Sequence, residues 1–372
     1  MMGKDFAVDN ALNAEVPFVL EQNESFQVLP FRRLLQPQVA GYKHNEAAMK
    51  ILITGGSGFL GKRLLAHLLK IGRIEIAGQS VHIDTITVFD TCAMDRVSQD
   101  VRVEVLKGNL NDPAAVAMAA SEADLVWHLA AVVSSAAEAD FDLGMNVNIH
   151  GLLCLLEELR KQRRRPRLVN TSGFAVFGGE LPDTVTDQTA PTPQSSYGMQ
   201  KAVAELLVAD YSRRGFIDGR TVRLPTIAIR PGRPNRAASS FVSSIIREPI
   251  AGQEAVCPVK KDTAVYISSP RSALRSLMMA MQLNEGMVRL SRTIPLPGIT
   301  VTIGGMVDAL RRIAGDEAVS KICWEPDPEI QRIVESWPSH VEARKATSLG
   351  FPQDVNIEEI ILAHIEEQSE EQ

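Results

Sequence analysis

Short apolar runs alternate with longer amphipathic stretches along most of the chain from residue 49 onward. Runs rich in Val, Ile and Leu predict strands at 50–54, 85–90, 101–106, 124–130, 167–172 and 221–225. Apolar residues at helical spacing predict helices between them, at 58–71, 113–121, 145–162 and 196–214. Strands that alternate with helices are typical of βαβ units, so we predict an α/β fold with a doubly wound parallel sheet.

The alternation breaks up after residue 225. The segments RPGRPN (230–235) and REPIAG (247–252) are rich in Pro, Gly and charged residues and predict loops. Two later stretches have helical spacing, at 304–315 and 357–367. Because no Gly/Ser-rich linker is visible, we expect residues 226–372 to form a smaller region that is interleaved with a first domain at 49–225.

The composition excludes several classes of function. The 372 residues carry a net charge of −6 with a pI near 5.7, which gives no basis for a nucleic-acid or membrane partner. No apolar run approaches the ~20 residues of a membrane-spanning helix. The four cysteines are scattered, with no CxxC pair and no histidine at metal-ligand spacing, which predicts reduced, mostly buried thiols and no metal site. We therefore expect a cytoplasmic protein.

Two further segments have simple interpretations. Residues 1–48 contain scattered acidic residues and no apolar signal-peptide core, so we expect a poorly ordered N-terminal extension. The basic cluster KQRRRPR at 161–167 lies between a predicted helix and a predicted strand, and we interpret it as a solvated helix end.

A glycine-rich run, TGGSGFLG at 54–61, follows the first strand and opens the first helix. Gly55 permits a tight turn, Gly58 lets the main chain approach a pyrophosphate, and Gly61 allows close contact between helix and strand. The N–H groups and partial positive charge of the helix N-terminus suit phosphates. This context predicts a Rossmann-like fold that binds a dinucleotide.

The second predicted strand ends at Asp90. A carboxylate at this point accepts both ribose hydroxyls of NAD and repels the 2′-phosphate of NADP, and Thr91 follows it where an arginine would favour NADP. Asp90 lies 29 residues after Gly61, which is longer than usual, and we interpret residues 73–84 as an inserted loop. The sequence therefore predicts NAD as the cofactor.

Tyr197 and Lys201, in the motif SSYGMQK, lie one helical turn apart and point the same way. A tyrosine with a pKa of ~10 is a poor base at neutral pH, but a neighbouring ammonium favours the phenolate. Because the pair follows the fifth predicted strand behind a dinucleotide-binding turn, it predicts a general base and its activator. Lys201 can also bind a cofactor ribose.

These motifs together resemble the extended short-chain dehydrogenase/reductase family, the NAD-dependent epimerases and dehydratases. The resemblance extends from about Met49 to near the end of the chain and rests on TGGSGFLG, Asp90, HLAA at 128–131, Asn148 with Gly151, and YGMQK. In the second half, RLPTIAIRPGRPN, REPIAGQEAVCPV, SSPRSA and LPGITVTIGGMVDALRRIAG resemble the D-erythronate dehydrogenases. Members of that group oxidise the C2 hydroxyl of a four-carbon sugar acid with NAD, so the resemblance implies a sugar-acid substrate.

The resemblance also implies roles for matching positions, with Tyr197 as the base and Lys201 as its activator. The residues implied in cofactor binding are Gly55, Gly58, Phe59, Leu60, Gly61, Asp90, Asn109, Leu110, Leu129, Ala130, Ala131, Asn148, Ser172, Tyr197 and Lys201. At Asn109 the family more often has Asp. The family further implies a homodimer, in which the helices containing 145–160 and 196–214 form a four-helix interface.

One position departs from the family. Its catalytic serine or threonine falls at Gly173. Because side chains alternate along a strand, Ser172 should face away from the Gly173 side, and Thr171 should share that side about 6–7 Å back. A β-bulge at the glycine would re-aim Ser172 towards the site. Ser172, Thr171, Thr226 and an ordered water are therefore the candidate sources of the hydroxyl, and we expect a slower or altered enzyme more readily than an inactive one.

Arginines follow the last predicted strand of the sheet, at Arg230, Arg233 and Arg271. A guanidinium group suits a planar carboxylate, and the resemblance favours Arg230 and Arg271 as substrate ligands. Thr226 and Asn235 are weaker candidates.

Two other functions remain open from the sequence. One is a nucleotide-sugar epimerase or dehydratase, in which tightly held NAD is reduced and then restored. The other is an NAD-binding protein that has lost its chemistry, which the glycine at position 173 makes conceivable. We interpret Trp127 as a core residue, and His128 and His150 as groove-lining or structural residues.

Overall fold

The computed structural model describes residues 49–92, 94, 100–162, 164–232 and 239–370. The predicted N-terminal extension, and Arg233 and Asn235 of the predicted loop, lie outside these residues. The described residues belong to one compact unit.

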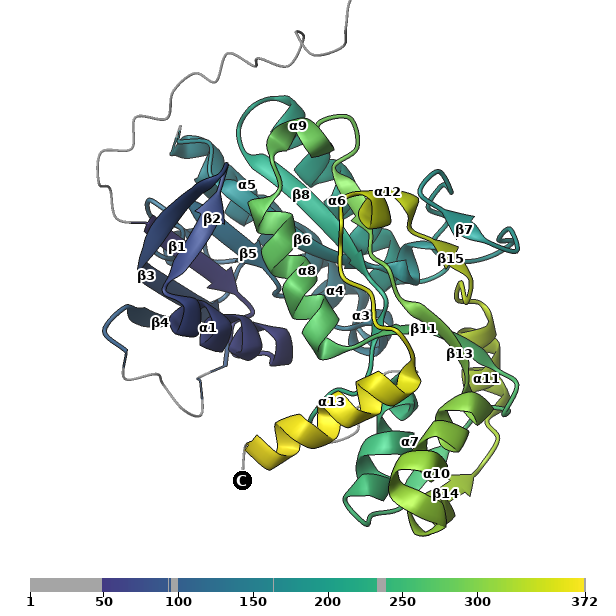
Figure 1. Ribbon diagram of the computed structural model, residues 1–372. Coiled ribbons are helices and arrows are strands. Elements are labelled where there is room, and N and C mark those ends of the chain that lie inside the picture. Colours follow the sequence, from purple (N-terminus) through teal and green to yellow (C-terminus); the bar gives the residue numbers. More distant parts are fainter. Residues whose placement is uncertain (1–48, 93, 95–99, 163, 233–238, 371–372) are drawn as a thin grey trace, which may run out of the picture. The chain divides into compact units, whose positions relative to one another are not determined.

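The predicted parallel sheet is confirmed (Figure 1). Its strands follow the order β12-β8-β6-β5-β1-β3-β2, and β4 also pairs with β3. Every pairing is parallel except that of β2 with the start of β3. The strands are β1 (Met49–Thr54), β2 (Arg73–Ile76), β3 (Gln79–Asp90), β4 (Val103–Lys107), β5 (Leu125–His128), β6 (Arg167–Gly173), β8 (Asp218–Leu224) and β12 (Thr293–Pro295).

The predicted loop at 73–84 is wrong. These residues form an antiparallel hairpin, in which β2 pairs with the first residues of β3 and the chain reverses at Ala77 and Gly78, both with positive φ. Polar and apolar residues alternate in RIEI, and the following Ala-Gly pair permits the tight turn. The hairpin accounts for the long spacing between Gly61 and Asp90.

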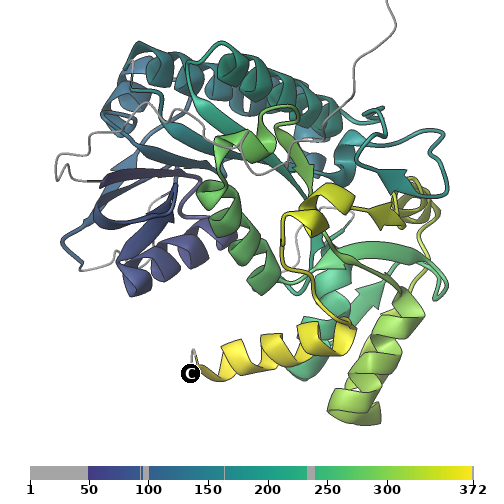
Figure 2. The same cartoon turned by 45° about the horizontal axis from the view of Figure 1, so that its top comes forward.

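Helices cover both faces of the sheet (Figures 1 and 2). Ile51 and Ile53 pack with α1 and α8, whereas Leu52 packs with α2, α5 and α6, because successive side chains of β1 point to opposite faces. Trp127 is fully buried and donates a hydrogen bond to the carbonyl of Leu277, so its assignment to the core is confirmed. These helices are α1 (Phe59–Ile71), α2 (Pro113–Ala119), α5 (Gly151–Lys161), α6 (Ser196–Arg213) and α8 (Pro270–Gln282).

Short helices connect β5 to α5. They are α3 (Ser134–Ala139), α4 (Phe141–Met145) and a π-helical turn at Asn146–His150. A short 3₁₀ turn, Phe174–Val176, follows β6.

The C-terminal part forms a second core around α7, α10 and α13. Two small sheets, β9-β11-β13 and β10-β14, contribute residues to this core, and β7 pairs with β15 in a further small sheet outside it. The elements are β7 (Val185–Thr186), β9 (Thr226–Ile227), α7 (Ser240–Ile250), β10 (Ala255–Cys257), β11 (Ala264–Ser268), α9 (Glu285–Val288), β13 (Ile299–Thr302), α10 (Ile303–Ser320), β14 (Ile322–Trp324), α11 (Pro328–Glu335), β15 (Val341–Glu342), α12 (Arg344–Ser348) and α13 (Ile357–Glu370).

One prediction for this part needs correction. Residues 247–250 of the predicted loop REPIAG are the last turn of α7, since Pro249 near the end of a helix removes few hydrogen bonds. The helix predicted at 304–315 is confirmed, because α10 begins at Ile303 and Gly315 interrupts its helical conformation with a φ of 81° before the element continues to Ser320.

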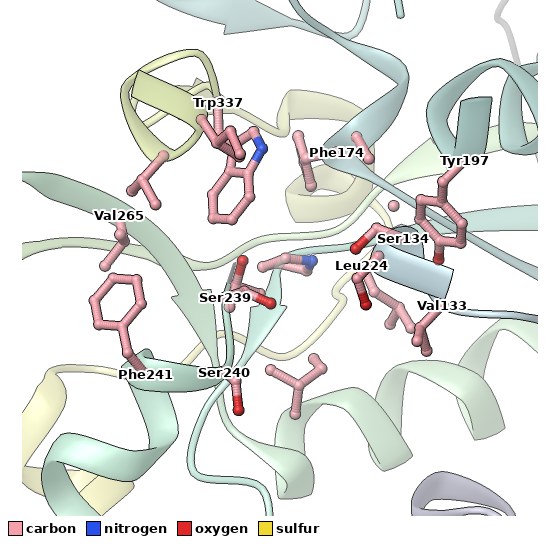
Figure 3. Close-up of a pocket in the computed structure, with 18 of the residues that line it drawn as sticks. Val133, Ser134, Phe174, Tyr197, Leu224, Ser239, Ser240, Phe241, Val265 and Trp337 are labelled. Atoms are coloured by element: carbon pink, nitrogen blue, oxygen red, sulfur yellow. The ribbon is translucent and has the colours of Figure 1, made fainter. Parts of the chain in front are cut away.

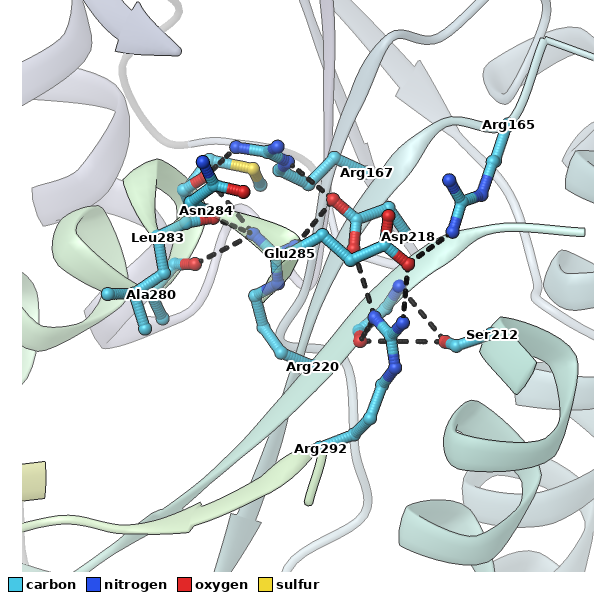
Figure 4. Close-up of polar contacts among 12 residues, drawn as sticks. Arg165, Arg167, Ser212, Asp218, Arg220, Ala280, Leu283, Asn284, Glu285 and Arg292 are labelled. Carbon is cyan, nitrogen blue, oxygen red and sulfur yellow. Dashed lines mark hydrogen bonds and ion pairs between the residues drawn. The ribbon is translucent and has the colours of Figure 1, made fainter. Parts of the chain in front are cut away.

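Buried charges join α8 to the main sheet (Figure 4). Asp218 at the start of β8 forms ion pairs with Arg220 at 2.6 Å, Arg167 at 2.9 Å and Arg292 at 3.0 Å. The Arg220 guanidinium also donates to the carbonyl of Ala280 near the end of α8. Arg167 belongs to the basic cluster at 161–167, so the prediction of a solvated helix end is wrong for this residue.

The cysteines are free, but the prediction of mostly buried thiols is wrong, because only Cys257 is buried and Cys92 is exposed. Across the described residues, no helix has the length and apolar character that crossing a membrane requires.

Candidate active site

A cavity of about 1370 Å³ opens at the carboxyl ends of the sheet strands (Figure 3). Residues that directly follow or end strands line it, among them Gly55 after β1, Leu129 after β5 and Gly173 at the end of β6. The volume exceeds the roughly 300–1,000 Å³ of most small-ligand sites. This is the edge at which open α/β sheets bind their ligands.

The glycine turn has the shape that a dinucleotide phosphate needs. Gly55 has a φ of 71°, and a Cβ there would lie 2.5 Å from the main-chain nitrogen of Ala130. A Cβ on Gly61 would lie 2.5 Å from the carbonyl oxygen of Gly55. Gly58 begins α1 with no side-chain cap and no acidic residue in the first turn, which leaves the helix N-terminus open to an anion.

Asp90 lies beside this turn at the end of β3. Its carboxylate accepts hydrogen bonds from the main-chain N–H groups of Ser57, at 3.0 Å, and Cys92, at 3.2 Å. The residues present therefore fit NAD, because the N-terminus of α1 would hold its phosphates and the Asp90 carboxylate would accept its ribose hydroxyls.

The other predicted cofactor residues are divided between cavity, interior and surface. Phe59, Leu60 and Leu129 line the cavity with the glycines, and Ala130 and Ala131 are half-buried after β5. Leu110 is buried against Gly151, and Asn109 is exposed, with its side-chain oxygen accepting the N–H of Asn111.

Tyr197 and Lys201 lie on the first turns of α6, where Ser195 caps the helix. The Lys201 ammonium lies 5.6 Å from the centre of the Tyr197 ring and donates to the carbonyl oxygen of Thr171 at 2.9 Å. Burial lowers the pKa of Lys201 to about 8, against the opposing charge of Glu205. Burial raises the pKa of Tyr197 to about 12, against the opposing charge of Arg230.

The hydroxyl groups next to Gly173 are already engaged. Ser172 donates to a carboxylate oxygen of Glu205 at 2.6 Å, within the buried ion pair that Glu205 forms with Arg223. Thr171 donates to the carbonyl oxygen of His128 at 3.2 Å. Ser172 therefore faces away from the Gly173 side, as the alternation along a strand predicts.

A bulge at Gly173 is excluded, because the pairing of β6 with β8 runs in register from Arg167 to Gly173 opposite Leu224. Gly173 is extended, with a φ of −159°. A Cβ there would meet its nearest atom, the carbonyl oxygen of Leu224, at 3.6 Å, an ordinary contact. The position thus has room for a Cβ atom.

The two predicted substrate arginines have different surroundings. Arg230 is half-buried in the cavity wall, donates to Ser239 at 3.4 Å and has no carboxylate partner among the described residues. Arg271 forms ion pairs with Glu366 and Glu367 of α13 and is absent from the cavity lining, which contradicts its assignment as a substrate ligand. Thr226 lines the cavity.

The two histidines interpreted as groove-lining or structural, His128 and His150, each contact a polar side chain. The Nδ1 atom of His128 lies 2.8 Å from the hydroxyl of Thr54, and burial lowers the pKa of His128 to about 3, so the ring is neutral. His150 is exposed and contacts Asn146.

Sequence reasoning missed several residues at the cavity. Ser134 of α3 lies near Tyr197, and Phe241, Val265 and Trp337 form an apolar wall at the other end (Figure 3); Ser135 also lines the cavity. The serines directly follow the HLAAVV segment, and this proximity is the one signal that the sequence carries for them.

A site of this construction, with a glycine turn, a strand-end carboxylate and a Tyr–Lys pair on one helix, defines a dinucleotide-dependent protein of the short-chain dehydrogenase type. The model of the NAD dependent epimerase/dehydratase family matches residues 51–303, and the chain belongs to this family. The predicted family and its NAD cofactor are thereby confirmed.

Particular relatives cover nearly the same length. The chain is 48% identical over 320 residues to D-erythronate dehydrogenase from Cupriavidus necator, and 46% identical over 319 residues to that from Haemophilus influenzae. Each match spans 86% of this chain, and 98% and 99% of the respective relatives. The nucleoside-diphosphate-sugar epimerase from Agrobacterium tumefaciens has a similar structure, with a TM-score of 0.82, 39% identity, and coverage of 90% of this chain and 99% of that chain.

Proposed function

We propose that this protein oxidises the C2 hydroxyl of a four-carbon sugar acid such as D-erythronate to the 2-oxo acid. The observation that carries the proposal is a cavity lined by Tyr197, which has Lys201 buried beside its ring, and by Arg230, a cation without a carboxylate partner among the described residues. The identity of 46–48% to D-erythronate dehydrogenases over most of the chain supports the same reaction. We assign cofactor binding mainly to residues 49–225 and substrate binding mainly to 226–372.

Arg230 orients the substrate in this scheme. Its half-buried guanidinium gives a carboxylate two parallel N–H donors at the end of the cavity that holds Tyr197. The charge of Arg230 also favours the Tyr197 phenolate, so the arginine contributes to both binding and base strength.

Tyr197 removes the proton from the C2 hydroxyl. Lys201 stabilises the phenolate, and its hydrogen bond to the Thr171 carbonyl fixes the ammonium below the ring. NAD, when bound, would supply the acceptor for the hydride of C2. The residues of the chain contribute orientation, electrostatics and the base, Tyr197, which takes the proton.

A substrate panel tests the proposal. Purified protein with NAD should form NADH steadily with four-carbon sugar acids, with kcat/KM at least about tenfold higher for D-erythronate than for its C2 epimer, because a misplaced C2 hydrogen loses the near-attack geometry. The control is the same panel with NADP, which Asp90 should disfavour. Equal rates with all acids would contradict the substrate assignment.

A nucleotide-sugar epimerase is the second candidate. The size of the cavity and the structural match to the Agrobacterium tumefaciens epimerase favour it. Incubation with nucleoside-diphosphate hexoses distinguishes the two, since an epimerase interconverts the sugars without net NADH.

We also infer a homodimer formed through α5 and α6. In support, Leu206 on the surface of α6 is 71% exposed and offers apolar area to a partner helix. Light scattering of the wild type and of Leu206→Glu tests this, and a monomeric wild type would contradict it.

A further inference from the structure

Ser134 begins α3 at the end of the cavity that holds Tyr197 (Figure 3). It is half-buried, and its hydroxyl has no hydrogen-bond partner within the described part of the chain. The hydroxyls of Thr171 and Ser172 are engaged elsewhere, and Gly173 has none. Ser134 is therefore an available donor at the end of the cavity that holds Tyr197.

The side chain of Asn148 holds the segment before Ser134 by pairing with its main-chain N–H and carbonyl groups. Asn148 accepts the N–H of Val132 at 2.9 Å and donates to the carbonyl of the same residue at 3.1 Å. Asn148 also donates to the Gln200 side chain at 2.7 Å, and Gln200 is fully buried on α6 next to Lys201. The start of α3 is thus fixed relative to the catalytic helix.

The end of α3 is fixed to the same helix. The Glu138 carboxylate accepts the main-chain N–H of Ser196 at 2.8 Å, directly before Tyr197. With both ends of α3 tied to α6, the Ser134 hydroxyl has a defined position relative to the base. Two other serine or threonine hydroxyls of the cavity, those of Ser135 and Thr226, also lack a partner among the described residues, and Thr226 lies on β9, which pairs with β11 outside the main sheet.

We propose that Ser134 donates the hydrogen bond to the C2 oxygen that a serine or threonine at position 173 would otherwise supply. This assignment rests on the proposed dehydrogenase function. Tyr197 takes the proton from the C2 oxygen. Ser134 orients this oxygen and stabilises the negative charge that develops on it.

A double-mutant cycle tests the assignment. Ser134→Ala should lower kcat/KM for D-erythronate by about 100-fold, the usual loss for one such donor. In the Gly173→Ser background the same change should cost less than about fivefold, because the restored serine takes over the contact. NADH binding, followed by fluorescence titration, should not change, and Ser134→Thr should retain most of the activity.

Matched variants decide between Ser134 and its neighbours. Ser135→Ala and Thr226→Val should have small effects that are equal in both backgrounds. The assignment is wrong if Ser134→Ala lowers kcat/KM by the same factor in the wild type and in the Gly173→Ser background. It is also wrong if the effect of Thr226→Val, rather than that of Ser134→Ala, depends on the residue at position 173. A wild type that is inactive with every sugar acid but becomes active with Gly173→Ser would also overturn the Ser134 assignment. The proposed reaction would stand in that case. Inactivity in both backgrounds would overturn the proposed function and the Ser134 assignment with it.

Discussion

Gly61 and Gly173 are both glycines of the site, but their surroundings differ. A Cβ on Gly61 would lie 2.5 Å from main-chain atoms, whereas one on Gly173 makes an ordinary contact at 3.6 Å. We expect Gly61→Ala to lower the free energy of unfolding by about 1–3 kcal/mol through overpacking. Gly173→Ala should instead raise it by about 0.5 kcal/mol, because alanine restricts the unfolded chain. Urea unfolding measures both, and equal losses would contradict the geometry.

Arg230 and Arg271 provide a second matched pair. Arg230→Ala should raise KM for the sugar acid by about 100-fold, because the carboxylate loses a charged bidentate partner. Arg271→Ala should leave KM unchanged and affect only stability, since its ion pairs with Glu366 and Glu367 hold α13. Steady-state kinetics on the two variants checks this. If Arg271→Ala raised KM more than Arg230→Ala does, Arg271 would be the substrate ligand.

The Tyr197–Lys201 pair predicts the pH dependence. The reactive form, a phenolate beside an ammonium, has lost one proton relative to the fully protonated pair, and the pair loses its first proton near the Lys201 pKa of about 8. We therefore expect kcat/KM to rise about tenfold per pH unit below this value and to level above it. In Lys201→Met the rise should move to higher pH, because burial raises the pKa of Tyr197 to about 12. A profile that is flat from about pH 6 to 8 would rule out this pair as the base.

Among the elements, α8 depends on buried charges for its position. Burial alone would raise the pKa of Asp218, but Arg220 and Arg167 outweigh burial and hold it below its ordinary value of 3.8. Asp218→Asn should lower the free energy of unfolding by about 3–5 kcal/mol at pH 7, because it leaves buried guanidiniums unpaired.

The sign of the pH effect follows from the lowered pKa. The stability contributed by the Asp218 carboxylate is present above its ordinary pKa and is lost as the pH falls through the lower folded value, so the gap between wild type and variant should narrow in acid. Asp210→Asn, in an exposed pair with Arg213, is the control and should have little effect. A comparable loss in this control would contradict the account.

The elements of the main sheet could be predicted because their patterns are local. Continuous apolar runs give the buried parallel strands, and the glycine run gives the first turn. The hairpin at 73–84 and the last turn of α7 could not be predicted from the sequence. A four-residue alternation and a proline near a helix end are weak local signals. The conformations of these two segments depend on packing against β3 and the second core.

At the scale of the molecule, the site draws on segments far apart in the chain. Tyr197 and Lys201 could be predicted because one helical turn joins them. Ser134 could not, since its place beside Tyr197 depends on Asn148, Gln200 and Glu138 across several elements. The surroundings of Arg271 could not be predicted for the same reason, because its acidic partners lie about a hundred residues later.

The central claim is that this protein oxidises a sugar acid by hydride transfer to NAD, with Tyr197 as the base. The most direct measurement is the initial rate of NADH formation from NAD and D-erythronate by the wild type and by Tyr197→Phe. We predict sustained formation by the wild type and a loss of at least about 100-fold in the variant, with NAD binding retained. Equal rates in the two proteins, or no NADH from a wild type that binds NAD, would contradict the account.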